Sequence, residues 1–227
     1  MPQALIVGAG AGLSASIATA LHAAGYAIGL AARNVDKLAA QAQRTGASLH
    51  ALDATDPAAV RDLFAALDRA GRAPEVAVYN ASFRVRGAIE TLDPEAVRRT
   101  LEVCAFGAFL VAQAAAVRML AAGRGTILLT GASAGVKGFP NSAPFAMGKF
   151  ALRGLAESMA RELHPRGVHV AHVVVDGGIA SPERSPPRGE DSLLDPDAIA
   201  ESYLAVIRQP RSAWSHEITV RPWTEVF

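Results

Sequence analysis

The stretch Leu5-Ile6-Val7-Gly8-Ala9-Gly10-Ala11-Gly12-Leu13-Ser14 decides the fold of this chain. A short apolar run leads directly into a glycine-rich turn, and a helix-like segment follows up to residue 24. Glycines let the backbone turn tightly and let a pyrophosphate approach it, while the start of a helix supplies free N–H groups. The stretch therefore predicts a strand, turn and helix that bind a dinucleotide through Gly8, Gly10, Ala11, Gly12 and Leu13. The alternative is a tight turn with no ligand.

Segments typical of strands and helices alternate along the rest of the chain. We expect strands over 4–7, 27–31, 48–51, 75–79, 125–130, 168–175 and 218–220, and helices over 13–24, 35–44, 57–70, 94–122, 144–163 and 196–208. This alternation predicts an α/β fold, a Rossmann-type doubly wound parallel sheet of about seven strands with helices on both faces. We expect a single domain over residues 1–227, with a substrate lid in the irregular segment around 176–195.

Composition narrows the classes of partner. Apolar residues make up 51% of the 227, and 22 basic residues nearly balance 21 acidic ones. This balance argues against disorder, against nucleic acid and against a membrane surface as partners, and favours a small-molecule substrate. The lone Cys104 fits a reducing cytoplasm. The apolar stretch 103–117 is expected to be a buried helix, and no metal site is predicted.

Further candidate cofactor contacts follow the next strands. Arg33 stands after the second strand without an acidic neighbour before it, which favours the 2′-phosphate of NADP(H) over NAD(H). The alternative is an exposed surface arginine. Asp53, beside Ala54, would accept a hydrogen bond from the adenine amino group, or else cap a helix, for which Asp56 is the stronger candidate. Asn80 and Ala81 are expected at the carboxyl edge of the sheet.

These features together resemble the short-chain dehydrogenase/reductase family over nearly the whole chain. The motifs that carry the resemblance are Gly8-x-x-x-Gly12-Leu13-Ser14, Tyr79-Asn80-Ala81-Ser82, Phe145-x-x-x-Lys149 and Asp176-Gly177. The resemblance implies an NAD- or NADP-binding oxidoreductase that forms a homodimer or homotetramer. It also implies cofactor contacts from Lys149, Gly177 and Ile179.

The family's catalytic residues match this chain at one position of four. In the family a serine orients the carbonyl, a tyrosine donates a proton, a lysine supports the tyrosine and an asparagine serves a water relay. The corresponding positions here are Ala132 (with Ser133 beside it), Phe145, Lys149 and Cys104. We therefore expect Lys149 to be the catalytic residue, and Ala132, Ser133, Pro140 and Phe145 to line the substrate pocket.

Phenylalanine has no proton to donate, so an active enzyme needs another source. The candidate donors are Tyr79, Ser133, Ser142, Tyr203 and Lys149 itself, whose pKa burial should lower. A substrate that needs no strong acid is a further possibility. With Phe83 and Phe139 also expected near the pocket, the predicted function is an NADP(H)-dependent oxidoreductase acting on a small hydrophobic or aromatic substrate. A non-catalytic NADPH sensor or scaffold, and a lyase or isomerase on the same fold, stay open.

Overall fold

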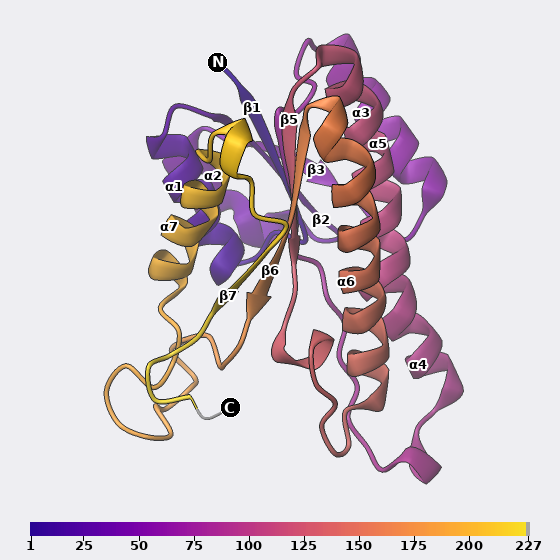
Figure 1. Cartoon of the computed structure of the whole chain (residues 1–227), viewed down its shortest axis with the longest axis vertical. Coiled ribbons are helices and arrows are strands. Elements are labelled where there is room, and N and C mark those ends of the chain that lie inside the picture. The colour runs from indigo at the N-terminus through magenta and orange to yellow at the C-terminus, as the bar shows by residue number, and fades with distance from the viewer. Residues whose placement is uncertain (226–227) are drawn as a thin grey trace.

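A computed structural model describes residues 1–225 and confirms the predicted fold (Figure 1). Seven parallel strands form one sheet in the order β3-β2-β1-β4-β5-β6-β7. The strands are β1 (Gln3–Val7), β2 (Ala27–Ala32), β3 (Ser48–Ala51), β4 (Val76–Tyr79), β5 (Gly125–Thr130), β6 (Val168–Val175) and β7 (Glu217–Val220). The order reverses between β1 and β4, which places a ligand crevice at the carboxyl ends of these strands.

Helices cover both faces of the sheet. The α-helices are α1 (Leu13–Ala23), α2 (Ala39–Thr45), α3 (Pro57–Arg69), α4 (Pro94–Leu101), α5 (Gly107–Ala122), α6 (Ala143–Leu163) and α7 (Pro196–Ile207). Figure 1 shows α1, α2 and α7 on one face and α3 to α6 on the other. Each face of the sheet has its own hydrophobic core. Alternate residues of β1 belong to different cores: Leu5 and Val7 to one, and Ala4 and Ile6 to the other. Burial on both faces explains why β1 is uniformly apolar.

Three helices begin at the same short motif, an aspartate followed by proline. The carboxylates of Asp56, Asp93 and Asp195 each accept hydrogen bonds from backbone N–H groups in the first turn of α3, α4 and α7. Proline at the next position loses nothing, because its missing N–H would have no partner within the helix. The motif fixes where these helices begin, as the sequence predicted.

The helix expected over 94–122 is continuous but contains a π-helical turn at Glu102–Phe106. The hydroxyl of Tyr79 donates to the carbonyl of Val103 within this turn, at 2.6 Å. A π-turn leaves the regular ladder of hydrogen bonds, and such turns often lie at functional sites. The segment Pro94–Ala122 is long and apolar enough to cross a membrane, but core helices often meet the same criteria. Half of its most apolar window is buried inside the molecule.

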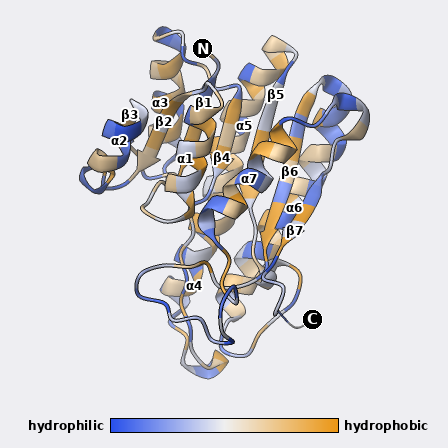
Figure 2. Cartoon of the chain, turned by 90° about the vertical axis from the view of Figure 1, so that its left-hand side faces the viewer, coloured by the Kyte–Doolittle hydropathy of each residue, from blue (hydrophilic) through white to orange (hydrophobic). Residues whose placement is uncertain are grey.

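The loops at the carboxyl ends of the strands extend well beyond the sheet. The segment between β6 and α7 forms a long loop, and most of its residues are hydrophilic (Figure 2). Ile179 and Leu194 form a parallel β-bridge that joins the two ends of this loop. At the far end of the chain, Trp214 stacks on His169 with ring centroids 4.7 Å apart, whereas Trp223 is 82% exposed.

A partly buried polar cluster of His172, Glu217 and Arg153 joins the last two strands to α6. His172 Nδ1 lies 2.9 Å from a carboxylate oxygen of Glu217, and Arg153 donates two hydrogen bonds of 2.8 Å to the same carboxylate. Burial lowers the pKa of His172, although Glu217 acts in the opposite direction. The folded protein therefore keeps this imidazole neutral at a pH where the unfolded chain would protonate it.

This cluster predicts that acid destabilises the fold. As pH falls below about 6.5, the unfolded chain binds a proton that His172 in the folded state does not, so the free energy of unfolding decreases, by up to about 1.4 kcal/mol per proton per pH unit. Thermal unfolding from neutral to mildly acidic pH should show a smaller drop in Tm for His172→Gln than for the wild type. Burial also lowers the pKa of His50 and His169, so some pH dependence should stay. The exposed His22→Gln is the control, and equal pH dependence in both variants would refute the assignment.

Candidate functional site

Two adjoining cavities lie at the carboxyl edge of the sheet. The first, of about 590 Å³, follows the glycine-rich turn and the ends of β2 and β4. The second, of about 1050 Å³, lies between α6 and the long segment after β6. Asn80 and Ser82 line both cavities, so the two spaces meet at the loop that follows β4.

The glycine-rich turn leaves open space above the start of α1. Gly8 has a φ of +84°, and a Cβ added there would lie 2.2 Å from the backbone nitrogen of Ala81. A Cβ on Gly10 or Gly12 would meet nothing within 4 Å, and no side chain caps α1. The turn therefore has room for a phosphate group beside free N–H groups, which is the arrangement that suits a pyrophosphate.

Asn80 is tied to this turn through Ser14. The Asn80 amide donates to the Ser14 hydroxyl at 2.7 Å, and that hydroxyl donates to the carbonyl of Gly8 at 3.0 Å. Serine in the place of the family's third glycine therefore joins the first and fourth strands at the cavity.

The far end of the first cavity carries positive charge. Arg33 and Lys37 line it, and within residues 1–225 neither side chain forms an ion pair. An exposed arginine with no carboxylate partner is free to bind a phosphate. Sequence reasoning identified Arg33 but missed Lys37, which lies four residues further along the chain.

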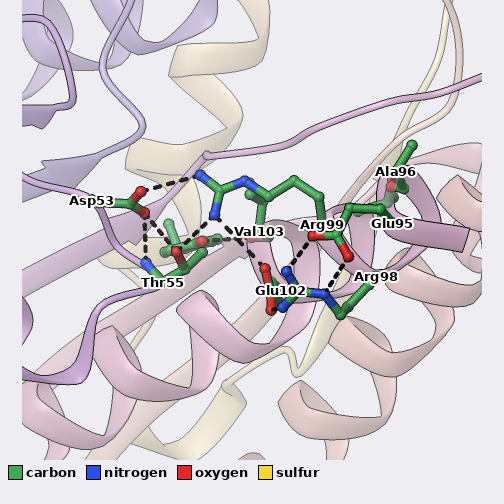
Figure 3. A network of polar contacts seen from close by, with 10 residues as sticks. Asp53, Thr55, Glu95, Ala96, Arg98, Arg99, Glu102 and Val103 are labelled. Carbon is green, nitrogen blue, oxygen red and sulfur yellow. Dashed lines mark hydrogen bonds and ion pairs between the residues drawn. The ribbon is translucent and has the colours of Figure 1, made fainter.

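Asp53 lines the same cavity and takes part in a polar network (Figure 3). Its carboxylate accepts from the Thr55 hydroxyl at 2.7 Å and from the Arg99 guanidinium at 3.1 Å. Burial alone would raise the pKa of Asp53, but the hydrogen bonds from Thr55 and Arg99 outweigh it and lower the pKa to about 2. Asp53 is thus an anionic acceptor, and Asp56 is the residue that caps α3.

Lys149 and Phe145 lie one helical turn apart on α6 and face the second cavity. The Lys149 ammonium is buried, donates to the carbonyl of Thr130 at 2.7 Å, and lies 5.7 Å from the centroid of the Phe145 ring. Burial lowers the pKa of Lys149, in the direction expected from the sequence. A cation with a lowered pKa at the floor of a cavity is a strong candidate for chemistry.

The structure distinguishes the four hydroxyl groups among the five candidate proton donors. Tyr79 already donates to Val103, and Tyr203 is paired with the Thr130 hydroxyl at 2.7 Å in the core, outside both cavities. Burial raises the pKa of both tyrosines. Ser133 and Ser142 line the second cavity, and the buried Ser142 hydroxyl has no hydrogen-bond partner within the described residues. The two serines are therefore placed to face a substrate, whereas both tyrosine hydroxyls already have hydrogen-bond partners.

The other residues expected at the site fall into the same two spaces. The first cavity is lined by Gly8, Gly10, Arg33, Asp53, Ala54, Asn80 and Ala81, and the second by Gly12, Leu13, Asn80, Ala132, Ser133, Pro140, Phe145, Lys149, Gly177 and Ile179. Ala11 lines neither cavity, and Phe83 does not line the second one, although Phe139 does. Within residues 1–225 no group of three or more His, Cys, Asp or Glu side chains is placed to hold a metal ion.

Comparisons with known proteins agree with this geometry. Residues 2–187 match the family model described as short chain dehydrogenase. An uncharacterized oxidoreductase of Staphylococcus aureus is 28% identical over 225 residues, which cover 96% of each chain. Trans-4-hydroxycyclohexanecarboxylate dehydrogenase of Sinomonas cyclohexanicum is 35% identical over 194 residues, or 79% of this chain and 73% of that one.

Solved structures extend the likeness to the whole fold. A short-chain dehydrogenase from Rhodopseudomonas palustris has a TM-score of 0.85 and 32% identity, covering 98% of this chain and 99% of its own. A metagenomic short-chain oxidoreductase in complex with NADP has a TM-score of 0.85 and 27% identity, covering 97% of each chain. The chain belongs to the short-chain dehydrogenase/reductase family of oxidoreductases.

Proposed function

We propose that the protein is an NADP(H)-dependent oxidoreductase whose active site lacks the family's tyrosine, serine and asparagine. The observation that carries this proposal is the pair of adjoining cavities. Arg33 and Lys37, which form no ion pair within residues 1–225, line the first cavity, and the buried Lys149 lines the second. The glycine-rich turn would hold the pyrophosphate, and Arg33 with Lys37 the 2′-phosphate. When bound, NADPH supplies the hydride.

The residues of the second cavity would orient the substrate and supply a proton. Lys149 places a buried ammonium in its lining, and burial lowers the pKa of this ammonium and so makes it a stronger acid. Ser142 offers a buried hydroxyl with no partner within the described residues, three residues before Phe145. We assign Lys149 as the proton source and Ser142 as the group that hydrogen-bonds the substrate oxygen.

The lining of the second cavity supports a substrate with an apolar body. Phe139, Pro140, Phe145 and Leu193 contribute apolar surface to it. Together with the segment 177–192, which closes one side as a lid would, they favour a small hydrophobic or aromatic compound.

A second function, an NADPH-binding sensor without catalysis, has two observations in its favour. Phe145 has no proton to donate at the position of the family's tyrosine. Cys104, at the position of the family's asparagine, is buried against the carbonyl of Phe83. Turnover separates the two functions, because a sensor binds NADPH and oxidises none of it with any substrate.

Nucleotide preference tests the cofactor assignment. Arg33→Ala is expected to weaken NADPH binding by roughly 10- to 100-fold and to leave NADH binding unchanged, because a charge-assisted hydrogen bond contributes about 1.5–3 kcal/mol. Titration of the purified protein, followed by the fluorescence of bound nucleotide, measures both affinities. The exposed Arg69→Ala on α3 is the matched control. Equal loss of NADPH and NADH affinity would refute recognition of the 2′-phosphate by Arg33.

Exposed apolar side chains on the π-turn, α5 and α6 support a homo-oligomer. Phe106 and Phe109 are 45% and 40% exposed with their rings 6.3 Å apart, and Met147 and Phe150 on α6 are similarly exposed. Exposed apolar side chains grouped in this way favour contact with a second copy. Sedimentation velocity measures the size of the assembly, and a monomer at micromolar concentration would refute it.

A further inference from the structure

Three arginines line the second cavity and have no carboxylate partner there. Arg84 and Arg86 come from the loop after β4, and Arg184 comes from the segment after β6. Among residues 1–225 none of the three forms an ion pair, and Arg184 only donates to the carbonyl of Ile179 at 3.1 Å. Among the residues that the structure describes, Glu225 is the one carboxylate in the lining, and it lies 3.8 Å from a fourth arginine, Arg188.

The guanidinium groups are close enough to affect one another. Burial lowers the pKa of Arg84, and the charges of Arg86 and Arg184 lower it further. The guanidinium carbon of Arg84 lies 4.9 Å from the centroid of the Phe145 ring. The Arg184 guanidinium passes close to Gly178, where an added Cβ would lie 2.8 Å from its nitrogen. Like charges held together without a counterion repel, and an anion bound between them would remove that cost.

The geometry points to an organic acid as the substrate, with its anionic group held by Arg84 and Arg184 and its apolar body against Phe139 and Phe145. The inference rests on the proposed function, since it names the substrate class of that same cavity. Guanidinium groups bind carboxylate and phosphate oxygens through two parallel hydrogen bonds, so both kinds of acid share the chemistry of this site.

The phosphates of the cofactor are a poorer match for these arginines. The glycine-rich turn, Arg33 and Lys37 account for them at the first cavity, and none of the three arginines lines that cavity. Arg84 lies instead over Phe145, one helical turn from Lys149, where the reacting part of a substrate would have to be. The three arginines therefore face the substrate side of the site.

Calorimetric titration with small aromatic compounds tests the inference. Benzoate and phenyl phosphate carry a charge, while benzamide has a similar shape and none. Each compound is titrated into the free protein and into its complex with NADPH. We expect at least one of the two anions to bind roughly 10-fold or more tightly than benzamide, which is about 1.4 kcal/mol. The tighter of the two identifies the acid as a carboxylate or a phosphate.

Two variants test whether the arginines cause the preference for an anion over benzamide. Arg84→Gln and Arg184→Gln are each expected to lower the preference for the anion several-fold while the Kd of NADPH is unchanged. Arg61→Gln removes an exposed arginine on α3 that lines neither cavity, and it should keep the full preference. High salt should reduce the preference in the wild type, because the arginines are exposed.

Several results would overturn the inference. Equal binding of anions and benzamide by the wild type, or no binding of either anion, would do so. A loss of NADPH affinity as large as the loss of anion affinity would assign the arginines to the cofactor instead. Failure of NADPH to bind would refute the proposed function, whereas the comparison on the free protein would still decide whether the cavity selects an acid.

Discussion

Replacing Phe145 with tyrosine is expected to raise the rate of NADPH-dependent ketone reduction by roughly 10²–10⁴, which is the usual contribution of a general acid. Phe145 is half-buried and lines the second cavity, so an added hydroxyl has room there. The new phenol would lie one helical turn from Lys149 and would be able to donate a proton to the developing alkoxide.

The surroundings of Phe145 should also activate the added phenol. The guanidinium carbon of Arg84 and the ammonium of Lys149 lie 4.9 Å and 5.7 Å from the ring centroid. Nearby positive charges stabilise a phenolate, so the pKa of the new tyrosine should be lower than about 10. The rate gained should therefore follow a pH profile that the wild type does not have.

An activated aryl ketone such as trifluoroacetophenone is a suitable test substrate, with the absorbance of NADPH as the readout. Phe150→Tyr is the matched control, because Phe150 is on the same helix and lines neither cavity. An unchanged rate in Phe145→Tyr would mean that the wild type does not lack a proton donor at this position. If the wild type is active, Ser142 and Lys149 would then be sufficient donors. If neither protein is active, the sensor function would be favoured.

Local signals in the sequence predicted most of the fold. Asp56, Asp93 and Asp195 each precede a proline, and each begins a helix, because capping depends only on neighbouring residues. The apolar strands were equally recognisable, since burial on both faces of a parallel sheet leaves no alternation. The π-turn at Glu102–Phe106 had no such signal, because it is supported by a contact with Tyr79, distant in the sequence.

The candidate site was predictable where it follows a strand and not where it depends on contacts between loops. Gly8, Arg33 and Asn80 each come directly after a strand, and the topology of a parallel sheet brings such residues together. Arg84 and Arg184 come from separate irregular loops, and only the three-dimensional structure places both in one cavity. The partners of Tyr79 and Tyr203 are also distant in the sequence, so the sequence did not reveal that both hydroxyls are already hydrogen-bonded.

Lys149→Met is expected to lower turnover by roughly 10²–10⁴ while the protein stays as stable as the wild type. A buried ammonium with one carbonyl partner is costly to keep charged, and methionine has a similar length without that cost. The carbonyl of Thr130 loses a donor, which costs about 1–3 kcal/mol and offsets part of the gain. Chemical denaturation measures the stability and steady-state kinetics measure the turnover.

The pH dependence of stability gives a second test of Lys149. Burial lowers its pKa in the folded state, so between that lowered value and the ordinary value near 10.4 the unfolded chain binds more protons. The free energy of unfolding of the wild type should therefore rise with pH over this range. Lys149→Met should lack this rise, and Lys137→Met, which removes a half-exposed lysine outside both cavities, should keep it.

The two readouts of Lys149→Met separate an enzyme from a sensor. An enzyme that uses Lys149 as its proton source should lose kcat by far more than NADPH affinity, because the lysine then acts mainly on the reacting substrate. A sensor has no turnover to lose, and its variant would show weaker NADPH binding alone. Normal turnover in a folded Lys149→Met protein would refute the role of Lys149 as proton source and would direct attention to the unpartnered hydroxyl of Ser142.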